Sequence, residues 1–186
     1  MRKIFIYYSF SNNGEAVSNY LKNKGYDIRR IKVKKDLPNN FFLSILTGGY
    51  KSLVNYKEKL VDFDNNIDDY DEILIGSPIW NDRLSSPITT LLDNINLEDK
   101  RIKFILYSGS GQGKHANEFI KSRYPNANII HLKEPKKNKE ELNKISEWNS
   151  LFYLNPTISR LIWINIYFYN FFERRKYEFK ENRRIN

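Results

Sequence analysis

The sequence contains no cysteine and only two histidines, His115 and His131, among its 186 residues. Without cysteine the chain can form no disulfide, no thiolate metal site and no cysteine nucleophile. Two histidines alone argue against a zinc centre or a histidine-based catalytic triad. We therefore expect no metal site and no thiol chemistry in this protein.

Long apolar runs are also missing. No stretch reaches the roughly 20 apolar residues that a membrane-spanning helix needs. The N-terminal apolar run at residues 4–8 is too short for a signal peptide, and no cleavage pattern follows it. We expect a cytoplasmic protein with at most peripheral membrane contact. The hydrophobic fraction of 40% is enough for the core of one domain with an appendage.

The formal net charge is +9, and it is unevenly distributed along the chain. Residues 1–150 carry 24 basic and 19 acidic side chains, whereas residues 151–186 carry 7 and 3. A basic surface attracts nucleic acid, anionic lipid or an acidic protein. Because no nucleic-acid-binding motif is recognisable, nucleic acid ranks last among these partners.

Strand-like and helix-like segments alternate along residues 1–150. The patterns predict strands at 3–9, 27–33, 71–77, 102–108 and 128–132, and helices at 14–24, 87–95, 114–123 and 138–148. This alternation is typical of a parallel sheet covered on both faces. An aromatic insertion at residues 37–60 predicts a helix broken at Gly48-Gly49, which packs on the sheet or lines a ligand edge.

Ligands of such sheets bind at the carboxyl ends of the strands. The segment SFSNNG at residues 9–14 follows the first predicted strand and opens a helix, whose N-terminus suits a phosphate. Ser9, Ser11 and Asn13 add side-chain donors, and no lysine or arginine lies between Ser9 and Ala16. A phosphate here would be held by neutral donors. Serine and asparagine are also ordinary helix caps, so a plain turn is the alternative.

Two further segments follow the third and fourth predicted strands. They contain Pro78, Ile79, Trp80 and Asn81, and Ser108, Gly109, Ser110 and Gly111. Trp80 can stack on a flat aromatic ligand, although a lone tryptophan can also be a surface anchor. The glycine-bearing segment satisfies neither the P-loop nor the dinucleotide fingerprint. Its glycines permit close approach of backbone N–H groups to a ligand such as a flavin.

Residues 3–150 resemble the small FMN-binding proteins of the flavodoxin family. YYSFSNNGEAV resembles their phosphate loop, usually Ser/Thr-x-Thr-Gly-Asn-Thr, in which Asn12 replaces the usual glycine and Gly14 the usual threonine. DYDEILIGSPIW and FILYSGSGQG resemble the second and third flavin loops. The resemblance implies a flavodoxin-like three-layer α/β sandwich with a five-stranded parallel sheet in the order 2-1-3-4-5.

By the same resemblance the cofactor is FMN. The implied contacts are Ser9, Phe10, Ser11, Asn12, Asn13, Gly14, Pro78, Ile79, Trp80, Asn81, Ser108, Gly109, Ser110 and Gly111. Trp80 would lie near the isoalloxazine, and Ser108–Gly111 would line its pyrimidine side. Tyr107, His115 and Asp82 lie near these loops, but no pattern identifies a catalytic residue among them.

Three functions are compatible with this interpretation. The first is an FMN redox protein that exchanges electrons with a partner protein or small acceptor. The others are an FMN-dependent quinone or nitro reductase and a flavin-free binding module of the same fold. The basic charge favours an acidic redox partner over a basic one.

The C-terminal extension, residues 151–186, contains the run TISRLIWINIYFYNFF at residues 157–172. Such a run must pack on its own domain, pair with a second subunit or lie in a membrane interface. Its aromatic residues and neighbouring arginines suit a dimer contact or a membrane interface. We interpret the extension as a helical arm that buries its aromatic side chains in a homodimer, with peripheral membrane contact as the alternative.

Overall fold

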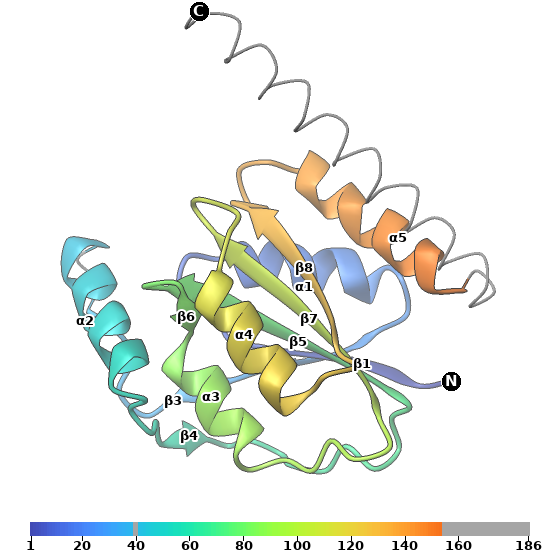
Figure 1. The fold of residues 1–186 in the computed structure, drawn as a ribbon, viewed down its shortest axis with the longest axis horizontal. Helices are drawn as coiled ribbons and strands as arrows, with labels where there is room; N and C mark the ends of the chain where they lie inside the picture. The colour runs from blue at the N-terminus through green and yellow to red at the C-terminus, as the bar shows by residue number, and fades with distance from the viewer. Residues whose placement is uncertain (39–40, 154–186) are drawn as a thin grey trace, which may run out of the picture. The chain divides into compact units, whose positions relative to one another are not determined.

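The computed structural model describes residues 1–38 and 41–153 (Figure 1). The chain divides into two units, Met1–Asn143 and Lys144–Asn186. The predicted aromatic arm at residues 157–172 lies outside the described residues. Within residues 1–38 and 41–153, no helix is long and apolar enough to cross a membrane.

The described part of the chain contains short strands and five helices. The strands are β1 (Lys3–Tyr7), β2 (Asp27–Arg30), β3 (Lys32–Val33), β4 (Leu60–Val61), β5 (Glu72–Trp80), β6 (Arg83–Leu84), β7 (Arg101–Ser108) and β8 (Asn128–Lys133). The helices are α1 (Asn13–Lys22), α2 (Phe41–Leu53), α3 (Ser86–Leu92), α4 (Lys114–Arg123) and α5 (Glu140–Tyr153).

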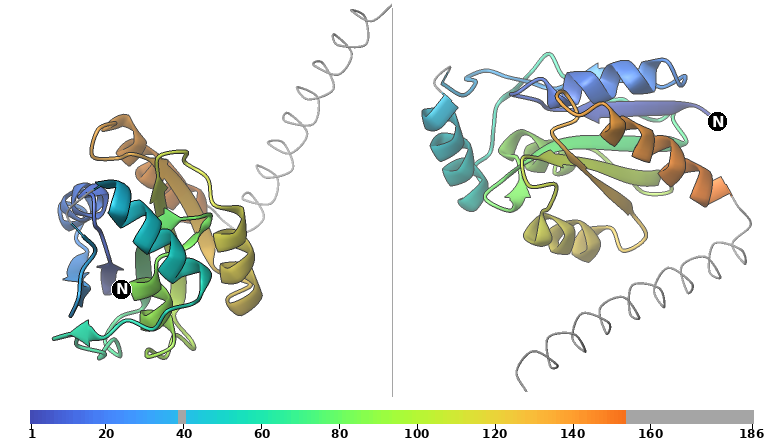
Figure 2. Two further views of the ribbon diagram at one scale, coloured as in Figure 1. Left: turned by 90° about the vertical axis from the view of Figure 1, so that its left-hand side faces the viewer. Right: turned by 90° about the horizontal axis from the view of Figure 1, so that it is seen from above.

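Five strands form a parallel sheet in the order β2-β1-β5-β7-β8. This order confirms the predicted arrangement 2-1-3-4-5. Helix α1 lies on one face of the sheet, and α3 and α4 lie on the other (Figure 2). The central strands read as continuous apolar runs because both of their faces are covered. Phe5, Leu74 and Phe104 are accordingly fully buried.

The predicted strand at residues 27–33 is divided in the structure. The Ile31 N–H donates to the Tyr7 carbonyl oxygen at 2.7 Å, where the chain leaves the parallel sheet. Beyond this point β3 pairs antiparallel with β4. The alternating pattern therefore predicted extended backbone but could not show that the strand changes partners.

The strand predicted to end at Ser77 continues to Trp80. Its last residues pair antiparallel with β6, so that Ile79 lies opposite Leu84. Asn81 and Asp82 form the turn with φ angles of 47° and 61°. Two positive φ angles are what the hairpin turn of type I′ requires, and asparagine and aspartate tolerate them. The predicted second loop is thus a short hairpin that fixes the direction of Trp80.

Helix α2 runs unbroken through Gly48 and Gly49, so the prediction of a helix interrupted there is wrong. A Cβ atom added to Gly48 would lie 2.7 Å from Trp80 Cε3. The glycine therefore allows the helix backbone to lie directly against the indole ring. A largely buried ion pair between Lys51 Nζ and Glu58 Oε1, 2.8 Å long, holds the far end of α2.

Candidate functional site

A hollow of about 700 Å³ opens where β1, β5 and β7 end. Its lining combines the β1–α1 loop, the β5–β6 hairpin, the end of β7, one residue of α2 and the β8–α5 loop. The lining residues are Phe10, Ser11, Asn13, Ser44, Pro78, Ile79, Trp80, Asn81, Tyr107, Ser108, Gly109, Glu134, Lys136 and Lys137. Segments far apart in the sequence therefore meet at one edge of the sheet (Figure 1).

A second hollow, of about 560 Å³, lies beside β4 away from this edge. Glu58, Asp62 and Asp64 are among its lining residues. Their carboxylates would repel an anionic ligand. Among the described residues, no cluster of histidine and acidic side chains could hold a metal ion. The hollow at the strand ends is the better candidate for an anionic cofactor.

The β1–α1 loop is held in shape by its own hydrogen bonds. Ser9 is 1% exposed, and its Oγ accepts a bond from the Gly14 N–H at 3.1 Å. Asn12 adopts a φ of 62°, in the left-handed region that asparagine tolerates. Asn13 Nδ2 donates to Ser11 Oγ at 3.0 Å, and both residues line the hollow. The loop therefore presents Ser11 and Asn13 at the positive end of α1.

Close packing explains the glycine at position 14. An added Cβ atom would lie 2.6 Å from Tyr7 Cδ2 and 2.7 Å from the Tyr107 hydroxyl oxygen. Nothing larger than glycine fits between the two tyrosines and Ser9. A threonine at this position would therefore clash with the tyrosines that this chain carries in β1 and β7.

Trp80 forms the aromatic wall of the hollow and is held from two sides. Gly48 of α2 lies against its ring, and Tyr8 meets it edge-on with the ring centroids 5.8 Å apart. The Tyr8 hydroxyl donates to Asp36 Oδ1 at 2.7 Å, which fixes the phenol ring. The indole is therefore positioned before any ligand arrives.

The glycine-bearing turn after β7 folds around the Ser108 hydroxyl group. Ser108 Oγ accepts bonds from the N–H groups of Gly111 at 2.9 Å and Gln112 at 3.3 Å. Gly111 adopts a φ of 71° against Lys133 of the neighbouring strand. Ser108 and Gly109 consequently line the hollow, while Ser110 and Gly111 shape the turn.

Tyr107 and Asp82, two titratable residues near the hollow, are engaged in structural contacts. The Tyr107 hydroxyl donates to the Tyr8 carbonyl oxygen, and burial raises the pKa of Tyr107 well above its ordinary value. Asp82 accepts bonds from the N–H groups of His115 and Lys114 at the start of α4 and from the His115 ring. These bonds, the His115 N–H foremost, lower the pKa of Asp82. Both side chains thus support the scaffold.

The packing of His131 makes stability depend on pH. Its Nε2 lies 2.8 Å from Asn117 Oδ1, and its buried Nδ1 has no hydrogen-bond partner among the described residues. Burial lowers the pKa of His131 below the ordinary 6.5. At pH values between the lowered pKa and 6.5, the unfolded chain therefore binds a proton at His131 that the folded chain does not bind. The stability contributed by neutral His131 should be present above pH 6.5 and be lost as the pH falls through the lowered value.

Urea unfolding at pH 7 and pH 5 measures this loss. His131→Gln can still donate to Asn117 but cannot take up a proton. The free energy of unfolding of this variant should therefore fall less between pH 7 and pH 5 than that of the parent. His115→Gln, at a more exposed histidine paired with Asp82, is the control. An undiminished loss in His131→Gln would contradict the assignment.

Nine of the fourteen predicted contact residues line the hollow: Phe10, Ser11, Asn13, Pro78, Ile79, Trp80, Asn81, Ser108 and Gly109. The other five, Ser9, Asn12, Gly14, Ser110 and Gly111, are absent from the lining and take part in the loops around it. Sequence reasoning missed Ser44 and the β8–α5 loop with Glu134, Lys136 and Lys137. That loop also follows the carboxyl end of a strand, which is the signal that could have found it.

Comparisons with known proteins agree with this architecture. Residues 50–150 match the model of the flavodoxin family. A proposed flavoprotein from Bacteroides eggerthii shares 21% identity at a TM-score of 0.58, covering 78% of this chain and 98% of that one. A flavoprotein from Lactobacillus acidophilus in complex with FMN shares 20% identity at a TM-score of 0.56, covering 80% and 98%. No curated protein matches the chain.

Proposed function

The chain belongs to the flavodoxin family, and we propose that it binds one FMN in the hollow at the ends of β1, β5 and β7 and exchanges electrons with a partner protein or small acceptor. This proposal rests on one observation, which is that three different structural features line the same hollow. A polar loop opens a helix, a fixed tryptophan forms one side, and a serine-glycine turn forms another.

The lining residues fit the chemistry of FMN. Ser11 and Asn13, at the N-terminus of α1, would hold the phosphate. Trp80 would lie along the isoalloxazine, and Ser108 and Gly109 would line its pyrimidine edge. When bound, FMN supplies the ability to take up and release electrons, while the protein positions and tunes it.

The hydrogen bonds made by Tyr107 and Asp82 favour an electron-transfer function over the function of a strict quinone or nitro reductase. General acid catalysis by a positioned side chain would assist a reductase. Tyr107 donates its proton to a backbone carbonyl group, and Asp82 accepts bonds from the start of α4. Where the acceptor is a protein, we infer that it is acidic, since the chain carries a net charge of +9.

Titration of the full chain with FMN tests the flavin assignment. Flavin fluorescence should be quenched at one FMN per chain, because Trp80 can stack on the ring. Trp80→Ala should weaken FMN binding by about 1–3 kcal/mol, the range of a buried aromatic contact. Tyr50→Ala, at an aromatic side chain 66% exposed and outside the hollow, is the control. Absence of binding at high micromolar FMN would overturn the flavin assignment in favour of a binding module.

A further inference from the structure

The β8–α5 loop brings positive charge to a phosphate loop that carries none. No lysine or arginine lies between Ser9 and Ala16. Lys136 and Lys137, more than a hundred residues further along the chain, line the same hollow as Ser11 and Asn13. The two loops are joined directly, because the Lys136 N–H donates to Asn13 Oδ1 at 3.1 Å.

This hydrogen bond also fixes the orientation of the Asn13 side chain. An asparagine amide has one accepting oxygen and one donating NH2 group. Since Oδ1 accepts from Lys136, Nδ2 is the group that donates to Ser11 Oγ. A second N–H of the same NH2 group then remains available as a donor at the phosphate loop.

The two lysines differ in how far their charge is neutralised. Lys137 Nζ lies 2.6 Å from Glu134 Oε1 in an ion pair. Lys136 is exposed, and within the part of the chain that the structure describes no acidic side chain pairs with it. Arg30, whose Nη2 donates to the Ser9 carbonyl oxygen at 3.3 Å, is paired with Glu15 at 2.9 Å. Of the two lysines that line the hollow, Lys136 is therefore the one whose charge no described acidic side chain compensates.

We propose that Lys136 binds the phosphate of FMN through its ammonium group and makes the site selective for FMN over riboflavin. The proposal rests on the proposed function. A phosphate monoester carries between one and two negative charges at neutral pH. Neutral donors leave most of that charge uncompensated, and a lysine on a flexible stem can reach it as a point charge. Riboflavin lacks the phosphate and gains nothing from this contact.

The test is to measure the binding of FMN and of riboflavin to the full chain, by quenching of flavin fluorescence, at several salt concentrations. Lys136→Gln should weaken FMN binding about 3- to 10-fold and flatten its salt dependence, while riboflavin binding stays unchanged. Lys136→Arg should retain most of the FMN affinity. Lys139→Gln removes an equal charge from an exposed residue outside the hollow and should leave both ligands unaffected.

The outcomes separate this proposal from the proposed function. If Lys136→Gln weakens the binding of FMN and of riboflavin equally, Lys136 acts by shaping the loop. That result would overturn the proposed contact between its charge and the phosphate. A parent protein that binds both flavins equally tightly would also overturn it, while the flavin function stands. Binding of neither flavin by the parent would overturn both. Thermal unfolding of each variant checks that the fold is intact.

Discussion

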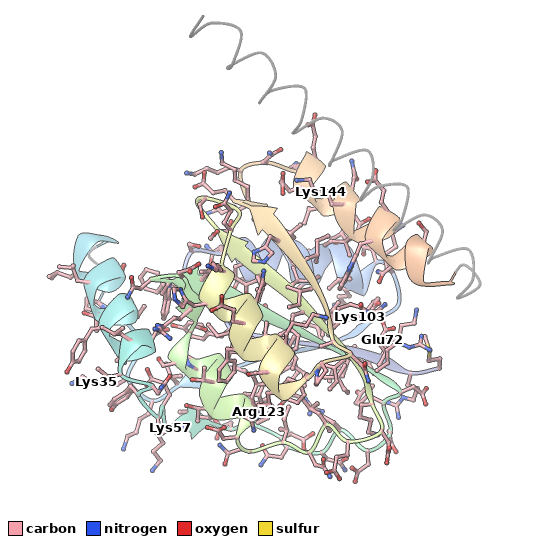
Figure 3. All side chains as sticks on the ribbon, in the orientation of Figure 1. Lys35, Lys57, Glu72, Lys103, Arg123 and Lys144 are labelled. Carbon is pink, nitrogen blue, oxygen red and sulfur yellow. The ribbon has the colours of Figure 1, made fainter. Side chains whose placement is uncertain are left out.

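Replacing Lys103 with methionine should lower the free energy of unfolding by about 3–5 kcal/mol, because it leaves a buried carboxylate without its ammonium partner. Lys103 and Glu72 are both fully buried, with Nζ and Oε2 3.0 Å apart. They lie at the end of the sheet opposite α2 (Figure 3). The Tyr26 hydroxyl donates to Glu72 Oε1 at 2.7 Å, and Arg101 Nη1 lies 3.7 Å from Glu72 Oε2, so part of the carboxylate stays satisfied in the variant.

Urea unfolding at pH 7 measures this effect, and a double variant separates charge from packing. Lys103→Met combined with Glu72→Gln removes both charges and keeps an acceptor for Tyr26. This double variant should recover a large part of the lost stability. FMN affinity should not change in folded Lys103→Met, since the pair lies far from the hollow. A single variant as stable as the parent would show that the pair contributes nothing.

Gly14→Ala should destabilise the fold by about 1–3 kcal/mol, the usual cost of forcing a methyl group into a filled site. The added carbon would approach Tyr7, Ser9 and Tyr107 to within 2.6–2.7 Å. Side chains on both β1 and β7 would have to shift to admit it. Because this position lies in the first turn of α1, the displaced loop should also bind FMN less tightly than the parent does.

Thermal unfolding and FMN titration of Gly14→Ala measure the two effects. For stability, Gly109→Ala is the matched control, since an added carbon there meets nothing within 4 Å. The control should keep the stability of the parent to within about 0.5 kcal/mol, as surface changes usually do. Equal stability of the two variants would contradict the crowding at Gly14.

Continuous apolar runs and helical spacing were sufficient for the main elements. The apolar runs after Arg2, Asp71 and Arg101 became the central strands β1, β5 and β7, and Lys114–Arg123 became α4 with the predicted bounds. Turn chemistry was harder to interpret. The hairpin after Trp80 depends on two residues with positive φ angles, and Gly48 serves close packing instead of a helix break. Neither choice follows from local sequence, because each depends on which segment lies opposite.

The resemblance to the flavodoxin family implied the order of the strands. By itself, the sequence determined the parallel α/β architecture and the edge of the sheet where a ligand site would form. These features depend on local periodicity and on the handedness of strand–helix–strand connections, which act over short stretches of chain. Only the tertiary structure decided that Glu72 meets Lys103, that Gly14 fits between two tyrosines and that Lys136 joins Asn13. Such contacts join residues tens of positions apart, and their distances are set by the packing of the whole sheet.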